Sequence, residues 1–217
     1  DLHCDETDDP NSRHILWVCR EKLQREFPRH VLAGHCTAMH SYPSDVAEDS
    51  IHQIVRSGVQ VVANPLDNIV LQGRGDGYPR RRGITRIPEL IAAGATVGLG
   101  HDSIMDPWYP LGRGHLVDAA SMLIHVAQMT RPPEIERVYR LMVDDNHAPF
   151  GGPPRLEVGE EANFLVHSVC TPTDVLRTRA VPRWVVRQGV VVAETPPQIS
   201  EVLGEALRPG LLGPEPS

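Results

Sequence analysis

Hydrophobic and polar positions along the first part of the chain follow a repeating pattern. Short apolar runs alternate with segments whose apolar residues recur every three or four positions. The runs predict buried parallel strands, and the longer spacing predicts amphipathic helices. The expected strands cover residues 2–4, 31–35, 59–63 and 96–100. Each is followed by a helical pattern, so the sequence predicts four βα units of a parallel sheet.

The expected helices are bounded by residues typical of helix ends. Asp, Asn and Ser within 9–12 predict the start of the first helix, and Gly58 predicts the end of a second helix that opens near Ser44. A loop over 72–83 and a short helix over 86–93 follow, and a further helix is expected around 116–127. The residues expected to face the core on the first two helices are Ile15, Cys19, Leu23, Phe27, Ala47, Ile51, Ile54 and Val55.

The pattern changes after Pro132. One more helix is expected over 134–143, followed by a strand over 163–167. Two valine-rich segments flank Gln188-Gly189 and predict a β-hairpin. We therefore expect a small β-sandwich appendage over 151–195 and a flexible tail over 196–217.

Polar residues stand just after the expected parallel strands. They are His3, Glu6, His35, Asn64, His101 and Asp102. Catalytic groups of an eight-stranded (β/α) barrel come from this end of several strands. A doubly wound sheet is disfavoured, because no strand is followed by the G-x-G-x-x-G phosphate turn. Four units make half of such a barrel, so residues 1–150 are expected to form a half-barrel.

Composition narrows the classes of partner. The formal net charge is −7, and no run of basic residues suits a nucleic-acid backbone. A small neutral or cationic molecule fits better. No apolar stretch approaches the ~20 residues of a membrane span, and no export leader is visible. The four cysteines lack paired spacing, which favours free thiols in a reducing, cytoplasmic compartment.

The polar residues after the strands suit a metal site. His3, His35 and Asp102 are of metal-ligand type and come from three different strands. Glu6 lies within reach as a group that moves protons to and from water. Each residue alone has an ordinary structural reading, as a hydrogen-bonded histidine or a salt-bridged carboxylate. We expect His3 and Asp102 to hold one ion. Glu6 and His35 should lie in a second layer, close enough to hydrogen-bond a metal-bound water. The arrangement with His35 as a third ligand stays open.

Several longer motifs resemble a known family. They are Asp1-Leu2-His3-Cys4-Asp5-Glu6, the segment 34–42, Ala63-Asn64-Pro65-Leu66, the segment 78–86, Gly100-His101-Asp102 and the segment 106–112. Together they resemble the bacterial barrel-type cytosine deaminases of the amidohydrolase superfamily. The resemblance covers about residues 1–195. It implies that the chain corresponds to strands 5–8 of a TIM-type barrel, with the preceding strands absent.

The resemblance also implies roles for individual residues. His3 is similar to a metal ligand, and Glu6 to the carboxylate that moves a proton to the ring nitrogen. His35 is similar to the histidine that orients the attacking water. Asp102 resembles a metal ligand and proton acceptor, and Trp108 a wall of the substrate pocket. The implied cofactor is one divalent ion, iron or zinc. Water would replace the exocyclic amine of a pyrimidine-type base, and ammonia would leave.

Departures from the family pattern leave the substrate open. Ser103 stands where cytosine deaminases usually carry a second acid, so we place it in the substrate-binding set as a residue that alters the pocket. The ring is then cytosine, a close analogue, or another cyclic amidine such as isocytosine or a triazine. A third reading is an inactive half-barrel with a binding role or none. We expect the full-length protein to be a homo-oligomer and the half-barrel alone to be inactive.

Overall fold

The computed structural model describes residues 1–152 and 156–197. The tail expected over 196–217 therefore lies outside the described residues from 198 onward. Within these ranges, no helix is both long and apolar enough to cross a membrane.

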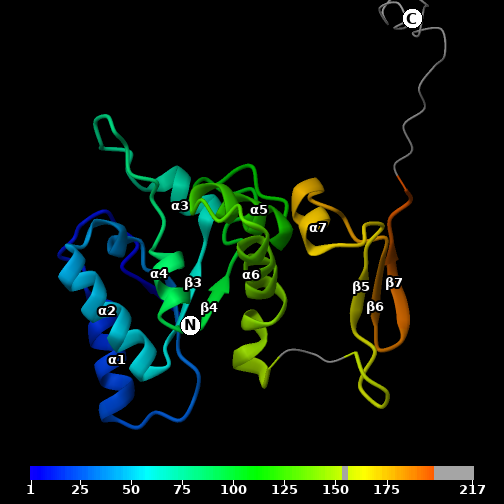
Figure 1. The fold of residues 1–217 in the computed structure, drawn as a ribbon, viewed down its shortest axis with the longest axis horizontal. Helices are drawn as coiled ribbons and strands as arrows, with labels where there is room; N and C mark the ends of the chain where they lie inside the picture. The colour runs from blue at the N-terminus through cyan, green and yellow to red at the C-terminus, as the bar shows by residue number, and fades with distance from the viewer. Residues whose placement is uncertain (153–155, 198–217) are drawn as a thin grey trace, which may run out of the picture.

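A parallel sheet forms the centre of the first part of the chain (Figure 1). Its strands are β1 (Leu2–Cys4), β2 (Leu32–His35), β3 (Gln60–Ala63) and β4 (Val97–Leu99). They pair in chain order, and all three pairs are parallel. The prediction of four parallel strands is confirmed. Because the strands run the same way, their carboxyl ends meet at one edge, where the polar residues were expected.

Helices cover the sheet and share one apolar core with it. In the view of Figure 1, α1 (His14–Gln24) and α2 (Ser44–Ser57) lie to the left of β3 and β4, and α5 (Leu116–Val126) and α6 (Pro132–Val143) lie to the right. The short helix α4 (Ile87–Ala92) lies between these pairs in the view. Fully buried side chains that join helices to strands include Ile15, Ile54, Val61, Leu90, Val97, Leu123 and Leu141. Burial of such side chains is the main favourable contribution to folding.

The start of α1 differs from the prediction. The expected cap within 9–12 does not cap the helix, which begins at His14 and has no side-chain cap from its own Arg13. Asp5 takes this role instead. Its Oδ1 accepts the His14 backbone N–H at 2.9 Å, and its Oδ2 accepts the Ile15 N–H at 2.9 Å. Carboxylates suit this position because the first helical N–H groups lack partners.

The end of the second helix was predicted correctly, but one of its side chains expected in the core is exposed. Gly58 ends α2 with φ +63°, the left-handed conformation that glycine adopts without strain. Val55, expected in the core, is 40% exposed. It lies one residue past the buried Ile54 and so faces away from the sheet.

One helix near the sheet edge was not predicted. Helix α3 (Pro65–Leu71) begins directly after β3, where only a connection to the loop over 72–83 was expected. Asn64 followed by Pro65 is a helix-start signal, since proline suits the first helical position. This helix brings Asp67 and Asn68 to the edge of the sheet.

Two 3₁₀ helices, η1 (Thr37–Ser41) and η2 (Asp145–Phe150), complete this part. The Asn146 side chain in η2 accepts the Leu99 N–H and donates to the Leu99 carbonyl, both at 2.8 Å. Both Leu99 groups lie on the side of β4 that has no neighbouring strand among the described residues. Asn146 therefore satisfies part of an otherwise open sheet edge.

The C-terminal part is a separate antiparallel sheet, with strand order β5 (Phe164–Val166), β6 (Trp184–Arg187), β7 (Val190–Glu194). The predicted hairpin is confirmed: Gln188 and Gly189 form the turn with φ of +51° and +76°. The described residues here form one sheet, so the two facing sheets of the expected β-sandwich are not found in this part of the chain. The boundaries of the three predicted regions stay a prediction.

Candidate metal centre

Three of the four parallel strands end in a left-handed backbone conformation. The residues are Asp5 after β1, His35 at the end of β2 and Asp102 after β4, with φ of +48°, +70° and +64°. Residues other than glycine rarely adopt positive φ, and such positions gather at functional sites. At these positions the chain turns sharply away from the sheet.

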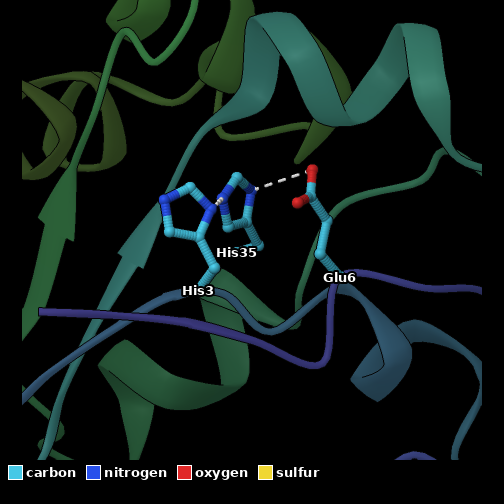
Figure 2. A group of neighbouring side chains, drawn as sticks. All are labelled: His3, Glu6 and His35. Carbon is cyan, nitrogen blue, oxygen red and sulfur yellow. Dashed lines mark hydrogen bonds and ion pairs between the residues drawn. The ribbon is translucent and has the colours of Figure 1, made fainter.

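His3 and His35 lie side by side at the ends of β1 and β2. Their rings are 4.9 Å apart between centroids, and His35 Nε2 lies 3.0 Å from His3 Nδ1. Glu6 approaches from the other side, with Oε1 3.3 Å from His35 Nδ1 (Figure 2). One ligand atom from each of the three residues lies within 4.8 Å of the others. The structure thus brings together three of the residues that the sequence singled out.

His35 is the most enclosed member of this group, with its side chain 2% exposed. Asn68 Nδ2 lies 3.0 Å from Nδ1 of His35, and Asn64 Nδ2 lies 3.3 Å from the same atom. Asp102 Oδ2 is 3.7 Å from that nitrogen, so Asp102 borders the group. Burial, and secondarily the nearby His3, lowers the pKa of His35 to about 4. The ring is therefore neutral at pH 7, the form that binds metals.

The pKa values of the carboxylates around His35 are raised, whereas the pKa of His35 is lowered. Burial and then the charge of Asp102 raise the pKa of Glu6. Burial also raises the pKa of Asp102 and of Asp67, and each of these is further raised by other acids nearby. Like charges held close in a poorly solvated place disfavour ionisation, and a cation removes that penalty.

These residues fit a divalent cation. The group offers two imidazole rings and carboxylate oxygens, the donors that zinc and iron take in hydrolytic sites. Two ligand atoms on one tetrahedral ion lie roughly 3.3 Å apart. The facing nitrogens of His3 and His35 are 3.0 Å apart, close to that separation. The same separation suits a hydrogen bond between the two rings, and the arrangement with His35 as a third ligand stays a prediction.

A cavity of about 520 Å³ opens beside the group. That volume lies within the range of small-molecule pockets. Its wall combines polar groups of the strand ends with apolar groups of α6 and η2, including His3, His35, Asn64, Asp102, Met142 and Phe150. Gly100 also borders it, and a Cβ there would collide with the Asn64 carboxamide. Glycine at this position allows the two strand ends to lie close together.

The two residues expected to bind substrate lie elsewhere. Trp108 is 61% exposed on the loop after β4. Ser103 donates its backbone N–H to Asp67 Oδ2 at 3.1 Å. Neither is among the described residues that line the cavity. His101 also points away from the group, since its Nε2 accepts the Gly114 N–H at 3.2 Å.

Sequence reasoning missed Asp67 and Asn68 as parts of this site. Asn64 and Asn68 are four residues apart, the spacing that places two side chains on one helix face. This spacing carries information only if the residues after Pro65 form a helix, and no helix was predicted there.

Similarity to known proteins agrees with this geometry. The profile of the amidohydrolase family matches residues 1–193. The chain belongs to the amidohydrolase family. Among solved structures, this amidohydrolase chain is similar to 5-methylcytosine deaminase from Klebsiella pneumoniae liganded with phosphonocytosine, with 32% identity and a TM-score of 0.87. That match covers 93% of this chain and 50% of the deaminase.

Two further proteins extend the comparison. A pterin deaminase from Rhizobium rhizogenes is 29% identical over 205 residues, which are 93% of this chain and 46% of that protein. N-isopropylammelide isopropylaminohydrolase from Burkholderia multivorans shares the fold, with a TM-score of 0.69 and 18% identity, over 83% of this chain and 43% of that one. The resemblance to barrel deaminases of the amidohydrolase superfamily is confirmed. The amidohydrolase chain spans about half the length of each of these proteins.

Proposed function

We propose that the complete protein is a metal-dependent hydrolase that removes an exocyclic amino group from a pyrimidine-type base and releases ammonia. The observation that carries the proposal is the group of His3, Glu6 and His35 at the carboxyl ends of adjacent parallel strands, in a chain of the amidohydrolase family. We further propose that β1–β4 are strands 5–8 of an eight-stranded barrel, since the similar proteins are about twice as long.

His3 and Asp102 would hold the cation, with His35 beside them to orient the attacking water, and iron or zinc suits this donor set. A bound divalent cation would supply an attacking water that ionises near neutral pH. Asn64 and Asn68 fix the ring of His35 through its Nδ1. The His35 ring is thereby held in one orientation before substrate arrives.

Glu6 would move the protons. Its raised pKa brings the carboxyl closer to neutral pH than that of an ordinary glutamate, which suits a group that both accepts and donates a proton. We propose that it takes a proton from the attacking water and delivers one to the ring nitrogen. Asp102, whose pKa is also raised, is the second proton acceptor.

The proposed substrate is cytosine or a close analogue. Two proteins similar to this chain are named as deaminases of 5-methylcytosine and of a pterin, so related pockets hold rings larger than cytosine. A cyclic amidine such as isocytosine or a triazine is the second candidate.

The test is an ammonia-release screen on the complete protein together with measurement of bound metal. Cytosine, 5-methylcytosine, isocytosine, pterin and an aminotriazine form the panel. We expect about one iron or zinc per chain and ammonia release from at least one pyrimidine. Chelator treatment should abolish release, and added metal should restore it. A protein that retains full activity without metal, or binds metal and releases no ammonia from any of these rings, would contradict the proposal.

We propose that residues 1–217 expressed alone show no deaminase activity. One edge each of β1 and β4 has no neighbouring strand among the described residues, and we propose that further strands of the complete protein close the cavity wall there. Ammonia release by residues 1–217 alone would contradict this proposal. It would also support a complete site within the half-barrel.

A further inference from the structure

A buried acid on α3 holds the segment that carries Asp102. Asp67 lies in the first turn of this helix and is 1% exposed. Its Oδ2 accepts the backbone N–H of Ser103 at 3.1 Å. This bond crosses from the end of β3 to the end of β4, so it joins two separate strand ends at the rim.

The bond lies next to a residue in the left-handed backbone conformation. Asp102 has φ +64°, a conformation that costs free energy in a residue with a side chain. Ser103 is the next residue, and an acceptor on its N–H fixes the peptide plane between the two. The Asp102 carboxylate then stands with Oδ2 3.7 Å from His35 Nδ1.

The other side of the turn is held in a similar way. Asp106 Oδ1 accepts the N–H groups of Trp108 and Tyr109, both at 3.0 Å. The Ser103 hydroxyl contributes to lowering the pKa of Asp106, after the larger effect of the Tyr109 N–H. Ser103 therefore lies between two carboxylates, and its side chain is engaged in holding the turn.

The two carboxylate oxygens of Asp67 differ in their hydrogen bonding. Its Oδ1 is buried and has no hydrogen-bond partner among the described residues. A buried polar side chain with one unpartnered oxygen costs free energy, so stability alone does not explain this hydrogen-bond acceptor. The position next to Asp102 and His35 points to a role at the site.

We propose that Asp67 is a positioning residue for the metal centre, which acts by fixing the Asp102 turn through the Ser103 N–H. The inference rests on the proposed metal site. It adds a residue outside the set of His3, Glu6, His35 and Asp102, and one that the sequence motifs did not single out. It also gives Ser103 a structural partner in place of direct contact with substrate.

The test measures metal affinity in the complete protein. Asp67→Leu removes the acceptor at similar size, Asp67→Ala removes it without adding bulk, and Asp67→Asn keeps an oxygen that accepts the Ser103 N–H. The dissociation constant for Zn²⁺ is measured by competition with a chromophoric chelator. Melting temperature is recorded to confirm that each variant is folded. Asp118→Asn is the matched control, because this partly buried acid of α5 is paired with Arg113.

We expect Asp67→Leu and Asp67→Ala to bind Zn²⁺ about 10–100-fold more weakly, the usual effect of removing a group that orients a metal ligand. Asp67→Asn and Asp118→Asn should stay near the unchanged protein. Unchanged affinity in folded Asp67→Ala would overturn the inference. An equal loss in Asp67→Asn would overturn it too, since charge and not the hydrogen bond would then matter. If the unchanged protein binds no Zn²⁺ or iron, the proposed function itself fails.

Discussion

The two sheets of this protein have similar strand lengths and opposite surroundings. The parallel sheet is covered by helices, and residues such as Ala33, Val61 and Val97 are fully buried. In the antiparallel sheet every residue of β7 is exposed. Among the described residues, the group that could hold a metal ion is His3, Glu6 and His35, and it lies at the ends of the parallel strands.

The difference shows how burial of a sheet changes the pKa values and orientations of the side chains at its strand ends. At the ends of β1, β2 and β4, side chains are close together and poorly solvated, so their pKa values shift and their orientations are fixed. In the C-terminal sheet, charged groups such as Arg183 and Glu194 pair at the surface, where water screens them. Function should therefore depend on the ends of the parallel strands and not on the antiparallel sheet.

The largest expected effect is that of Glu6→Gln in the complete protein. Amide in place of carboxylate removes the proton carrier, and kcat should fall by about 10²–10⁴-fold. Bound metal should be retained, because His3 and Asp102 remain. Steady-state ammonia release and metal content are the measurements. Glu89→Gln, a surface acid paired with Arg86, serves as control. An active Glu6→Gln variant would show that protons move by another group.

The next effect concerns His35 and pH. An unfolded histidine titrates near 6.5, while burial lowers the pKa of His35 to about 4 in the folded chain. Protons therefore bind the unfolded state first, and stability falls as pH decreases from about 6.5 to about 4. The loss from this residue should be about 3 kcal/mol in metal-free protein. Urea unfolding of His35→Gln should lack this part of the pH dependence. A variant with the same pH profile as the unchanged protein would contradict the assignment.

Asp5 should affect stability by a smaller amount. Hydrogen bonds from Ile15, Ser12 and His14 together outweigh the burial of Asp5 and lower the pKa of its carboxyl. The resulting stability is present above the unfolded pKa of ~3.9 and is lost as pH falls through the lower folded value. Asp5→Ala should cost about 2 kcal/mol at pH 7, because it removes the cap of α1.

Urea titration at pH 7 checks the Asp5 value. Asp9→Ala is the control, since Asp9 lies in the segment first expected to cap this helix. Equal losses in the two variants would mean that Asp5 has no special role.

The smallest effect is expected in the C-terminal sheet. Glu194→Gln removes an ion pair with Arg183 in which the glutamate side chain is 55% exposed. Exposed pairs of this kind contribute about 0–1 kcal/mol. Deaminase activity should be unchanged. A clear loss of kcat in folded Glu194→Gln would show that the second sheet takes part in function.

Much of this architecture could be predicted from the sequence. Periodicity alone indicated the four parallel strands and α2, because buried strands and amphipathic helices have distinct spacings. Residues at the strand ends, such as His3 and His35, were found for the same reason: parallel strands bring their carboxyl ends to one edge.

Other features depend on contacts that no local pattern records. The carboxylate that caps α1 comes from Asp5, nine residues before His14. The hydrogen bond from Ser103 to Asp67 joins segments 36 residues apart. Trp108, expected at the pocket wall, lies on an exposed loop. Spacing shows which element a residue belongs to, but it does not show how loops from different strands meet.

The most direct test of the central claim is a crystal structure of the complete protein grown with zinc or iron, with anomalous data collected at the metal edge. We predict one strong anomalous peak at the carboxyl ends of β1 and β2, about 2.0–2.2 Å from a ring nitrogen of His3. The same peak should lie within reach of His35, with Glu6 close enough to contact a bound water. A peak at another place, with none beside His3 and His35, would contradict the account.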